Sequence, residues 1–262
     1  MSGGDLRRGQ WLGVLALVER EVVRRVVRLW PQTIAPQVMA SALFVVVFGL
    51  ALGNSIRTVG GVPYEQFIVP GLTLMGVATA AFANNATTLF QARSDGFIED
   101  PVSSPMTPVQ LAVAYTSGGV IRGLVIGLLT LGAARVFVDF PLHHAAAFLL
   151  ALLLAALAFS GLGTVVGLYS RSWELQSFVG SLVIQPLVFL GGVFYSVQAL
   201  DAPWEAVSHL DPILYMVEAG RWALLGRADI DPWISFGVSG GLAALMLAWS
   251  WWLFERGEGL RT

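Results

Sequence analysis

Six long apolar segments dominate the sequence of this chain, and most of its charged residues lie between them. The hydrocarbon core of a bilayer is about 30 Å thick, so a helix needs about 20 residues to cross it. Each segment reaches that length. We therefore predict an all-α, polytopic membrane protein with six transmembrane helices, at about 32–53, 67–90, 109–136, 146–169, 176–197 and 233–254.

The composition supports this class and excludes several functions. Hydrophobic residues make up 56% of the chain and charged residues 12%, against about 25% charged in soluble domains. No cysteine is present, which excludes disulfides and cysteine metal sites. All 15 basic residues are arginine, so the lysine of a phosphate-binding P-loop is missing. We expect no ATP hydrolysis by this chain, no cofactor or metal on it, and no nucleic-acid partner.

Residues 1–30 have the pattern of an amphipathic helix at the membrane surface. Apolar residues recur at spacings of three or four: Leu15, Val18, Val22, Val26 and Leu29. Charged residues gather on the opposite side: Arg20, Glu21, Arg24, Arg25 and Arg28. A helix that docks on a soluble partner is the alternative. The charges that interrupt this segment do not fit a signal peptide.

Three polar side chains inside the apolar segments are candidates for a transport pathway. Asn84 and Asn85 lie toward the end of the second span, and Gln185 lies in the fifth. Polar groups at that depth are costly unless they face protein or water. They could line a route for cargo, or they could join helices by hydrogen bonds.

Arg122 is a charge near the middle of the third span. Gly119, Gly123 and Gly127 beside it allow close approach of another helix. An arginine at depth costs at least about 2.5 kcal/mol on insertion scales, so it either meets a partner or extends to the membrane surface. We expect Glu174 as its partner, and a role for the pair in buried charge or gating.

The stretch from 176 to 225 changes character along its length. The fifth span carries Gln185-Pro186 near its middle, which predicts a kink. Two short helices, at about 203–210 and 212–225, each begin with proline and carry tryptophan. We expect these helices to lie outside, in the interface or dipping back into it.

This stretch resembles the end of ABC-2 type permeases, the membrane subunits of a class of ABC exporters. The resemblance rests on LGGVFYSV at 190–197, HLDP at 209–212 and GRW at 220–222. It is closest to the branch of daunorubicin-resistance and lipo-oligosaccharide exporters, where Asn usually stands at the position of Asp211. Either residue caps a helix. The resemblance implies a kink and external gate made of Pro186, Gly191, Gly192, Phe194, Tyr195, Asp211, Pro212 and Arg221.

The hydrophilic segment 91–108 separates the second and third spans. Prolines delimit a short helical piece around 96–103. The residues alone indicate an ordinary solvated loop. The resemblance implies a coupling helix that docks on a separate ATPase subunit, which would hold ATP and Mg. The residues implied for that contact are Arg93, Asp95, Gly96, Glu99, Asp100 and Ser103. Residues 31–262 would then form the ABC-2 transmembrane domain.

The arginines predict the orientation of the six spans. Ten lie at the termini or in the loops predicted on the same side of the membrane as the termini. Four lie in the segments predicted on the other side, and Arg122 is within a span. By the positive-inside rule both termini are cytoplasmic, in a multi-pass protein of the cytoplasmic (inner) membrane.

Together these features predict the permease subunit of an ATP-driven exporter of an amphiphilic, drug-like or lipid/glycolipid substrate. It would act in membrane lipid as a dimer, with a homodimer favoured over a heterodimer. An ion-coupled secondary transporter is the alternative, but it requires an acidic residue in mid-span, and all 17 carboxylates fall outside the predicted spans. An intramembrane enzyme would require paired catalytic groups that the spans do not offer.

Overall fold

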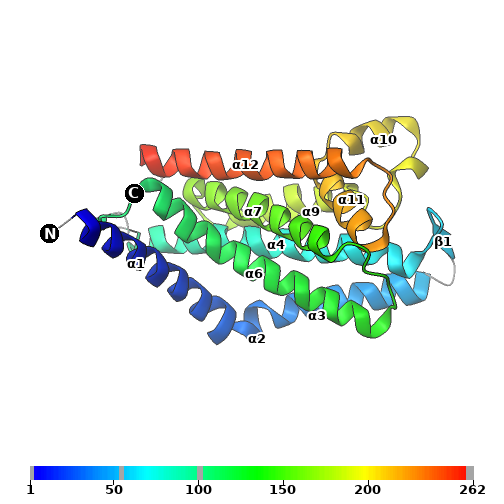
Figure 1. Cartoon of the computed structure of the whole chain (residues 1–262), viewed down its shortest axis with the longest axis horizontal. Helices are drawn as coiled ribbons and strands as arrows, with labels where there is room; N and C mark the ends of the chain where they lie inside the picture. The colour runs from blue at the N-terminus through cyan, green and yellow to red at the C-terminus, as the bar shows by residue number, and fades with distance from the viewer. Residues whose placement is uncertain (1–2, 53–55, 99–102, 258–262) are drawn as a thin grey trace.

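The computed structural model describes residues 3–52, 56–98 and 103–257. Within these residues, six helices are long and apolar enough to cross a membrane, which confirms the predicted all-α polytopic class. The only strands described, β1 (Thr58–Val59) and β2 (Val62–Pro63), form a short antiparallel hairpin in which Val59 pairs with Val62. Figure 1 shows the start of α1 and the end of α12 at one end of the bundle, and the hairpin and α10 at the other.

The helix bounds follow the predicted spans closely, with one exception. Span one is α2 (Trp30–Thr33), α3 (Ala35–Phe44) and the π-helical η2 (Val45–Leu52). Spans two, three, four and six are α4 (Tyr64–Ser94), α6 (Pro108–Phe137), α7 (Ala145–Tyr169) and α12 (Pro232–Arg256). Span five is α8 (Trp173–Phe178), the π-helical η3 (Val179–Ile184) and α9 (Gln185–Leu190). It ends at Leu190, not at 197 as predicted.

Span five stops early because the chain turns at two glycines. Gly192 has φ +72°, a conformation that side chains disfavour. A Cβ on Gly191 would come within 2.9 Å of Ile213, so the turn lies directly against α11 (Pro212–Leu225). Pro186 follows the π-helical segment η3. Proline has no backbone N–H to donate, and the wider hydrogen-bond spacing of a π-helix accommodates it.

The helix ends are set by local sequence. Thr107 and Gln110 form a reciprocal capping box at the start of α6. Asp231 accepts hydrogen bonds from the first turn of α12, and Gly226 ends α11 in the left-handed conformation. These ends fix where the spans enter and leave the bundle.

Helix α4 is the centre of the molecule (Figure 1). It packs against α6, α7 and α11, and 83% of its apolar window is buried. Glycines allow this close packing: a Cβ on Gly167 of α7 would lie 2.9 Å from the carbonyl oxygen of Ala86. We call α4, α6, α7, α11 and α12 the packed bundle.

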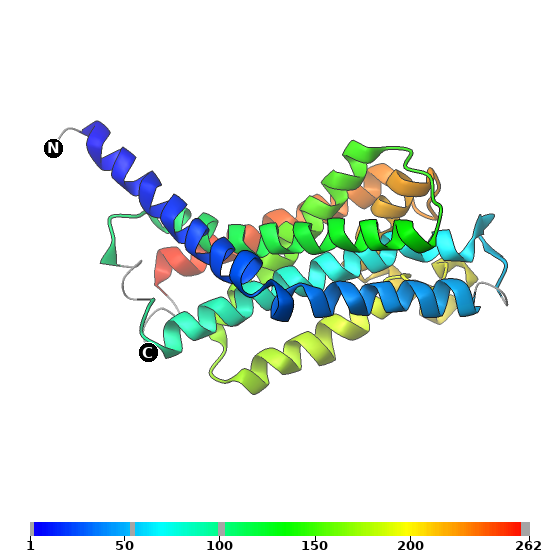
Figure 2. The same ribbon diagram turned by 90° about the horizontal axis from the view of Figure 1, so that it is seen from below.

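Spans one and five lie at the periphery of this bundle. Only 22% and 17% of their apolar windows are buried. Figure 2 shows span five, in yellow-green, along the edge of the bundle. Both contain a π-helical segment. This helix type is rare in proteins, and where it occurs it is often at a functional site. Their outer faces carry large exposed apolar residues such as Leu43 and Leu182.

The predicted N-terminal helix is present, and the face that packs on the bundle is not the predicted apolar face. Helix α1 (Gly3–Val22) is continued by the π-helical η1 (Val23–Arg28), and the chain bends at Leu29, directly before Pro31. Val14 and Leu17 are buried against the bundle, while Leu15 of the predicted apolar face is 62% exposed, so the contact of that face with the membrane stays a prediction. Glu21, predicted on the charged outer side, is 3% exposed. The spacing 14, 17, 21 forms the buried face because α1 packs on α6.

Two short helices follow span five, as predicted. Helix α10 (Ala202–His209) exposes Trp204 and Val207, so it lies on the surface of the bundle. The 3-10 turn η4 (Val197–Ala199) precedes it. Helix α11, in contrast, is enclosed by α4, α7 and α12, and almost all its residues are buried. It is a structural part of the packed bundle.

Candidate functional site

A hollow of about 420 Å³ lies between spans one, two and five. We call it the polar groove. Hydroxyl and amide side chains line it: Gln37, Thr79, Thr87, Gln176, Ser177, Ser181 and Gln185. Phe82 and Trp173 add aromatic surface, and none of the described lining residues is charged. Uncharged polar side chains at membrane depth indicate contact with water or with a hydrogen-bonding ligand.

The hydrogen bonds of the groove leave donor capacity on its wall. Gln37 Nε2 donates to Thr79 Oγ1 at 3.2 Å, which ties span one to α4. Gln176 is 6% exposed, and its Nε2 has no hydrogen-bond partner within the described part of the chain. A buried amide left without a partner is unfavourable by about 1–3 kcal/mol. A partner supplied from inside the groove would remove that penalty.

Helix α4 carries a second polar face, turned away from the groove. Asn85 Nδ2 donates to Ser160 Oγ at 2.7 Å and to Thr164 Oγ1 at 3.0 Å, both on α7. Asn84 Nδ2 donates to the side chain of Asn85. The structure therefore supports the second interpretation of these two residues: they join helices in the core. Gln185, the third pathway candidate, does line the groove.

Arg122 is placed differently from the prediction. It donates to the backbone carbonyl of Thr33 at 2.8 Å, where α2 ends before α3 begins. Glu174 is exposed and its carboxylate bonds to Ser172 in the turn before span five. The predicted pairing of these two residues is wrong, because Arg122 faces span one and not span five.

The segment after α4 is described in part. Asp95 and Gly96 form an exposed turn, with Gly96 at φ +76°, and Ser103 is exposed. Arg93 donates within its own chain, to the carbonyls of Leu168 and Ser170 at the end of α7. Glu99 and Asp100 lie outside the described residues. A coupling role for this segment stays a prediction.

A buried ion pair lies at the opposite end, on α11. Arg221, 3% exposed, pairs with Glu218, 0% exposed, one helical turn earlier. Arg221 also donates to the carbonyl of Gly192 at 2.7 Å and lies over the ring of Phe67. Glu218 accepts from the backbone N–H of Asp229 at 2.6 Å. Sequence reasoning missed Glu218, although its spacing of three residues from Arg221 on a predicted helix was a usable signal.

The other predicted gate residues gather around the end of span five. Phe194 packs on Phe48 of span one, and Tyr195 donates to the carbonyl of Leu190 at 2.9 Å. Asp211 caps α11 by accepting from the N–H of Ile213. Burial raises the pKa of Asp211 to about 6, although that hydrogen bond opposes the shift.

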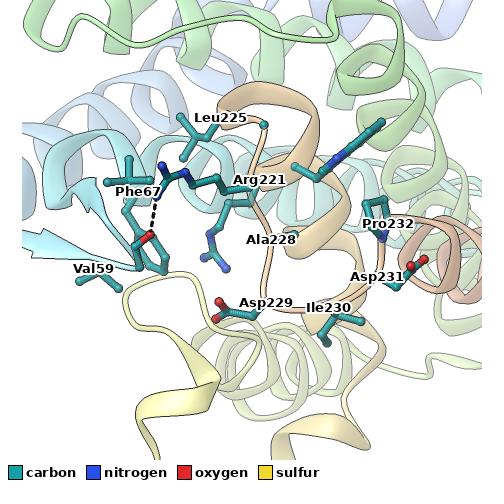
Figure 3. A pocket seen from close by; sticks show the side chains of 14 residues that line it. Val59, Phe67, Arg221, Leu225, Ala228, Asp229, Ile230, Asp231 and Pro232 are labelled. Atoms are coloured by element: carbon teal, nitrogen blue, oxygen red, sulfur yellow. Dashed lines mark hydrogen bonds between the residues drawn. The ribbon is translucent and has the colours of Figure 1, made fainter.

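A second hollow, of about 440 Å³, lies beside the ion pair (Figure 3). Figure 3 shows Arg221 and Asp229 on adjoining walls. Its polar groups are largely bound within the chain. Asp229 accepts from Ser196, Arg227 donates to the carbonyl of Gly60, and Asp231 caps α12. These bonds hold the loop between α11 and α12, so the polar groove is the better candidate for cargo.

Six candidate spans, and a polar groove with no charge among its described lining residues, are features of a membrane transport protein. The chain matches the model of the ABC-2 type transporter family over residues 13–225, and it belongs to that family. It is 36% identical to the inner membrane transport permease YadH of Escherichia coli K12, over 96% of this chain and 98% of that protein. It is 28% identical to nodulation protein J of Neorhizobium galegae, over 73% of this chain and 74% of that protein. The chain is thus a permease subunit of an ABC transporter.

Proposed function

We propose that this permease exports an amphiphile whose head group is uncharged and forms hydrogen bonds. The cargo would leave the cytoplasm or the inner leaflet with its head group in the polar groove and its apolar part against lipid or the partner copy. Lipids, glycolipids and drug-like molecules all include such amphiphiles. The observation that carries the proposal is the composition of the groove, which offers seven hydroxyl or amide side chains and no charge among its described lining residues.

The chemistry of the groove favours one kind of head group. A phosphate or carboxylate would lose its hydration there without gaining a cationic partner, which is costly at low dielectric. A hydroxyl or amide can accept from Gln176 Nε2 and donate to the groove hydroxyls. Trp173 and Phe82 supply flat apolar surface for the less polar faces of the same group.

The energy would come from a separate ATPase subunit that binds ATP and Mg. The family implies such a partner in general. In this proposal both termini face the cytoplasm, and the ATPase contacts the segment 91–108 and α1. Two copies of the permease, favoured as identical chains, would enclose the cargo route. Spans one and five are the least buried of the six candidate spans, at 22% and 17% against 28% for spans three and six, so their faces are open to a second copy.

The test uses the permease co-purified with its ATPase and reconstituted in liposomes. The probes are diacylglycerol lipids with one acyl composition and four head groups: neutral glucosyl, zwitterionic phosphocholine, anionic phosphoglycerol and cationic trimethylammonium. We expect the glucosyl lipid to stimulate ATP hydrolysis most, and the stimulation to fall in Gln176→Leu. Gln32→Leu, the same substitution at an exposed glutamine of span one that does not line the groove, is the matched control.

Two results would overturn the proposal. Stimulation only by water-soluble polar solutes would exclude an amphiphilic cargo. Transport that is driven by an ion gradient with the ATPase removed would identify an ion-coupled transporter instead.

A further inference from the structure

Glu21 is a buried carboxylate at the contact of α1 with α4 and α6. It extends from α1 against α4 and α6, where Thr88 Oγ1 of α4 donates to Glu21 Oε2 at 3.2 Å. Arg20 lies 3.5 Å from Glu21 Oε1, and is itself half exposed. Carboxylates are seldom buried unless they are paired or hydrogen-bonded. These polar contacts add a link from α1 to α4 to the apolar packing of Val14 and Leu17.

A glycine on α6 makes room for this contact. A Cβ on Gly118 would lie 3.3 Å from Glu21 Cβ and 3.4 Å from Asn84 Nδ2, so both side chains lie against that glycine. Beyond them, Asn84 donates to Asn85, and Asn85 donates to Ser160 of α7. Ser160 in turn donates to the carbonyl of Thr116 on α6. A polar network thus runs from Asn84 into the centre of the packed bundle, and Glu21 lies beside its outer end.

This network and the polar groove occupy two faces of one helix. Positions 79, 83 and 87 of α4 line the groove, while 84, 85 and 88 contact the network. Because α4 is rigid and central, a shift of its inner face also moves its groove face. The contact of Glu21 with Thr88 is one helical turn from Asn84, and Thr87 is next to it in sequence.

We propose that Glu21 is a positioning residue for transport: it fastens α1 to α4, so that movement of α1 driven by the ATPase reaches the groove. This inference rests on the proposed function. Nucleotide-driven displacement of α1 would be carried through Thr88 to α4. Without the contact, α1 would still pack on α6 through Val14 and Leu17, but its movement would reach α4 less fully, and more ATP would be hydrolysed per cargo molecule moved.

The first experiment measures cargo transported per ATP hydrolysed in the reconstituted complex. Thr88→Val removes the donor, Thr88→Ser keeps it, and Glu21→Leu removes the acceptor. Glu19→Gln, exposed on the same helix, is the control. We expect the ratio to fall about tenfold or more in Thr88→Val and Glu21→Leu, the effect of a lost hydrogen bond to a charged group. Thr88→Ser and Glu19→Gln should keep the wild-type ratio.

A purely structural role would give a different pattern. Loss of folded protein lowers transport and ATP hydrolysis in parallel and leaves their ratio unchanged. That result would overturn the inference. A ratio in Thr88→Val equal to wild type would also overturn it.

The second experiment needs no transport and stays informative if the proposed function fails. The chain has no native cysteine, so spin labels at Leu15→Cys on α1 and Leu128→Cys on α6 are the only labels. Both positions are exposed. With labelled chains diluted in an excess of unlabelled chain, so that only distances within one copy are measured, we expect one narrow distance distribution, broadened by Thr88→Val and Glu21→Leu and restored by Thr88→Ser. An unchanged distribution in Thr88→Val would show that Glu21 does not fasten α1.

Discussion

Helix α4 and span five are neighbours in the molecule but differ in how they are held. Four fifths of the α4 window are buried, against less than one fifth in span five. Helix α4 is a continuous α-helix of 31 residues, whereas span five is interrupted by the six-residue π-helical segment η3. The polar groove lies where these two elements meet.

The difference shows how the chain combines stability with movement. Many polar groups in the packed bundle bind one another, as Asn85 binds Ser160 and Thr164, although Asn84 Oδ1 and Thr130 Oγ1 have no partner within the described residues. Polar groups in span five face the groove and are left to bind water or cargo. Regions with few buried contacts open at low free energy. We therefore expect substitutions in the packed bundle to lower stability, and those in span five to alter transport.

The largest effect is expected at the buried ion pair. Arg221→Met leaves the carboxylate of Glu218 buried without its cation, which typically costs about 3–5 kcal/mol. Thermal unfolding in detergent, followed by tryptophan fluorescence, should show a large drop in Tm. The double variant with Glu218→Leu should recover most of it. Asp139→Asn, in the exposed pair with Arg135, should change stability by at most about 1 kcal/mol. Equal losses at both pairs would contradict this contrast.

Matched glycine substitutions compare the two regions directly. A Cβ on Gly163 of α7 would collide with the carbonyl oxygen of Phe82 and lie 3.1 Å from Asn85 Cβ. Gly163→Ala should therefore destabilise the chain by about 1–3 kcal/mol, the usual range for overpacking. A Cβ on Gly180 in span five would meet Phe82 at 3.5 Å, an ordinary contact. Gly180→Ala should leave Tm unchanged or slightly raised, and a loss equal to that of Gly163→Ala would refute the comparison.

A substitution in the groove should separate function from stability. Gln176→Leu removes a buried amide donor that has no partner in the described part of the chain. We expect Tm to stay the same or to rise, and the concentration of cargo for half-maximal ATPase stimulation to increase about tenfold. Titration of cargo with the reconstituted complex measures this shift. A lower Tm with unchanged stimulation would assign Gln176 to the structural core instead.

The smallest effect is a pH dependence at the junction of span five and α11. Burial raises the pKa of Asp211 from 3.8 to about 6, so the folded chain binds more protons than the unfolded chain between those pH values. Stability should fall as pH rises through that window. Asp211→Asn keeps the helix cap and removes the charge. The difference in Tm between pH 5 and pH 7 should shrink in this variant, and an undiminished difference would contradict the burial of Asp211.

The sequence predicts the spans well and the site only in part. Hydropathy locates all six spans because lipid demands length and apolar composition, and proline marks the starts of α10 and α11. Hydropathy does not show which polar face meets which helix. Asn85 and Gln185 are both amides within an apolar span, yet Asn85 bonds to α7 and Gln185 lines the groove. The burial of Glu21 and Glu218 depends on tertiary packing, which hydropathy does not report. The turn at Gly192 ends span five although the apolar sequence continues beyond it.

The most direct test of the central claim is the access of water to the polar groove. Ser181→Cys is at an exposed position that lines the groove, whereas Leu245→Cys is at an exposed position on α12 that does not line it. Maleimides react with the thiolate and therefore need water at the site. In membranes containing the complex, a water-soluble maleimide should label Ser181→Cys rapidly and block transport, and should leave Leu245→Cys unlabelled. Equal labelling at both positions, or none at Ser181→Cys, would contradict a hydrated cargo path between α4 and span five.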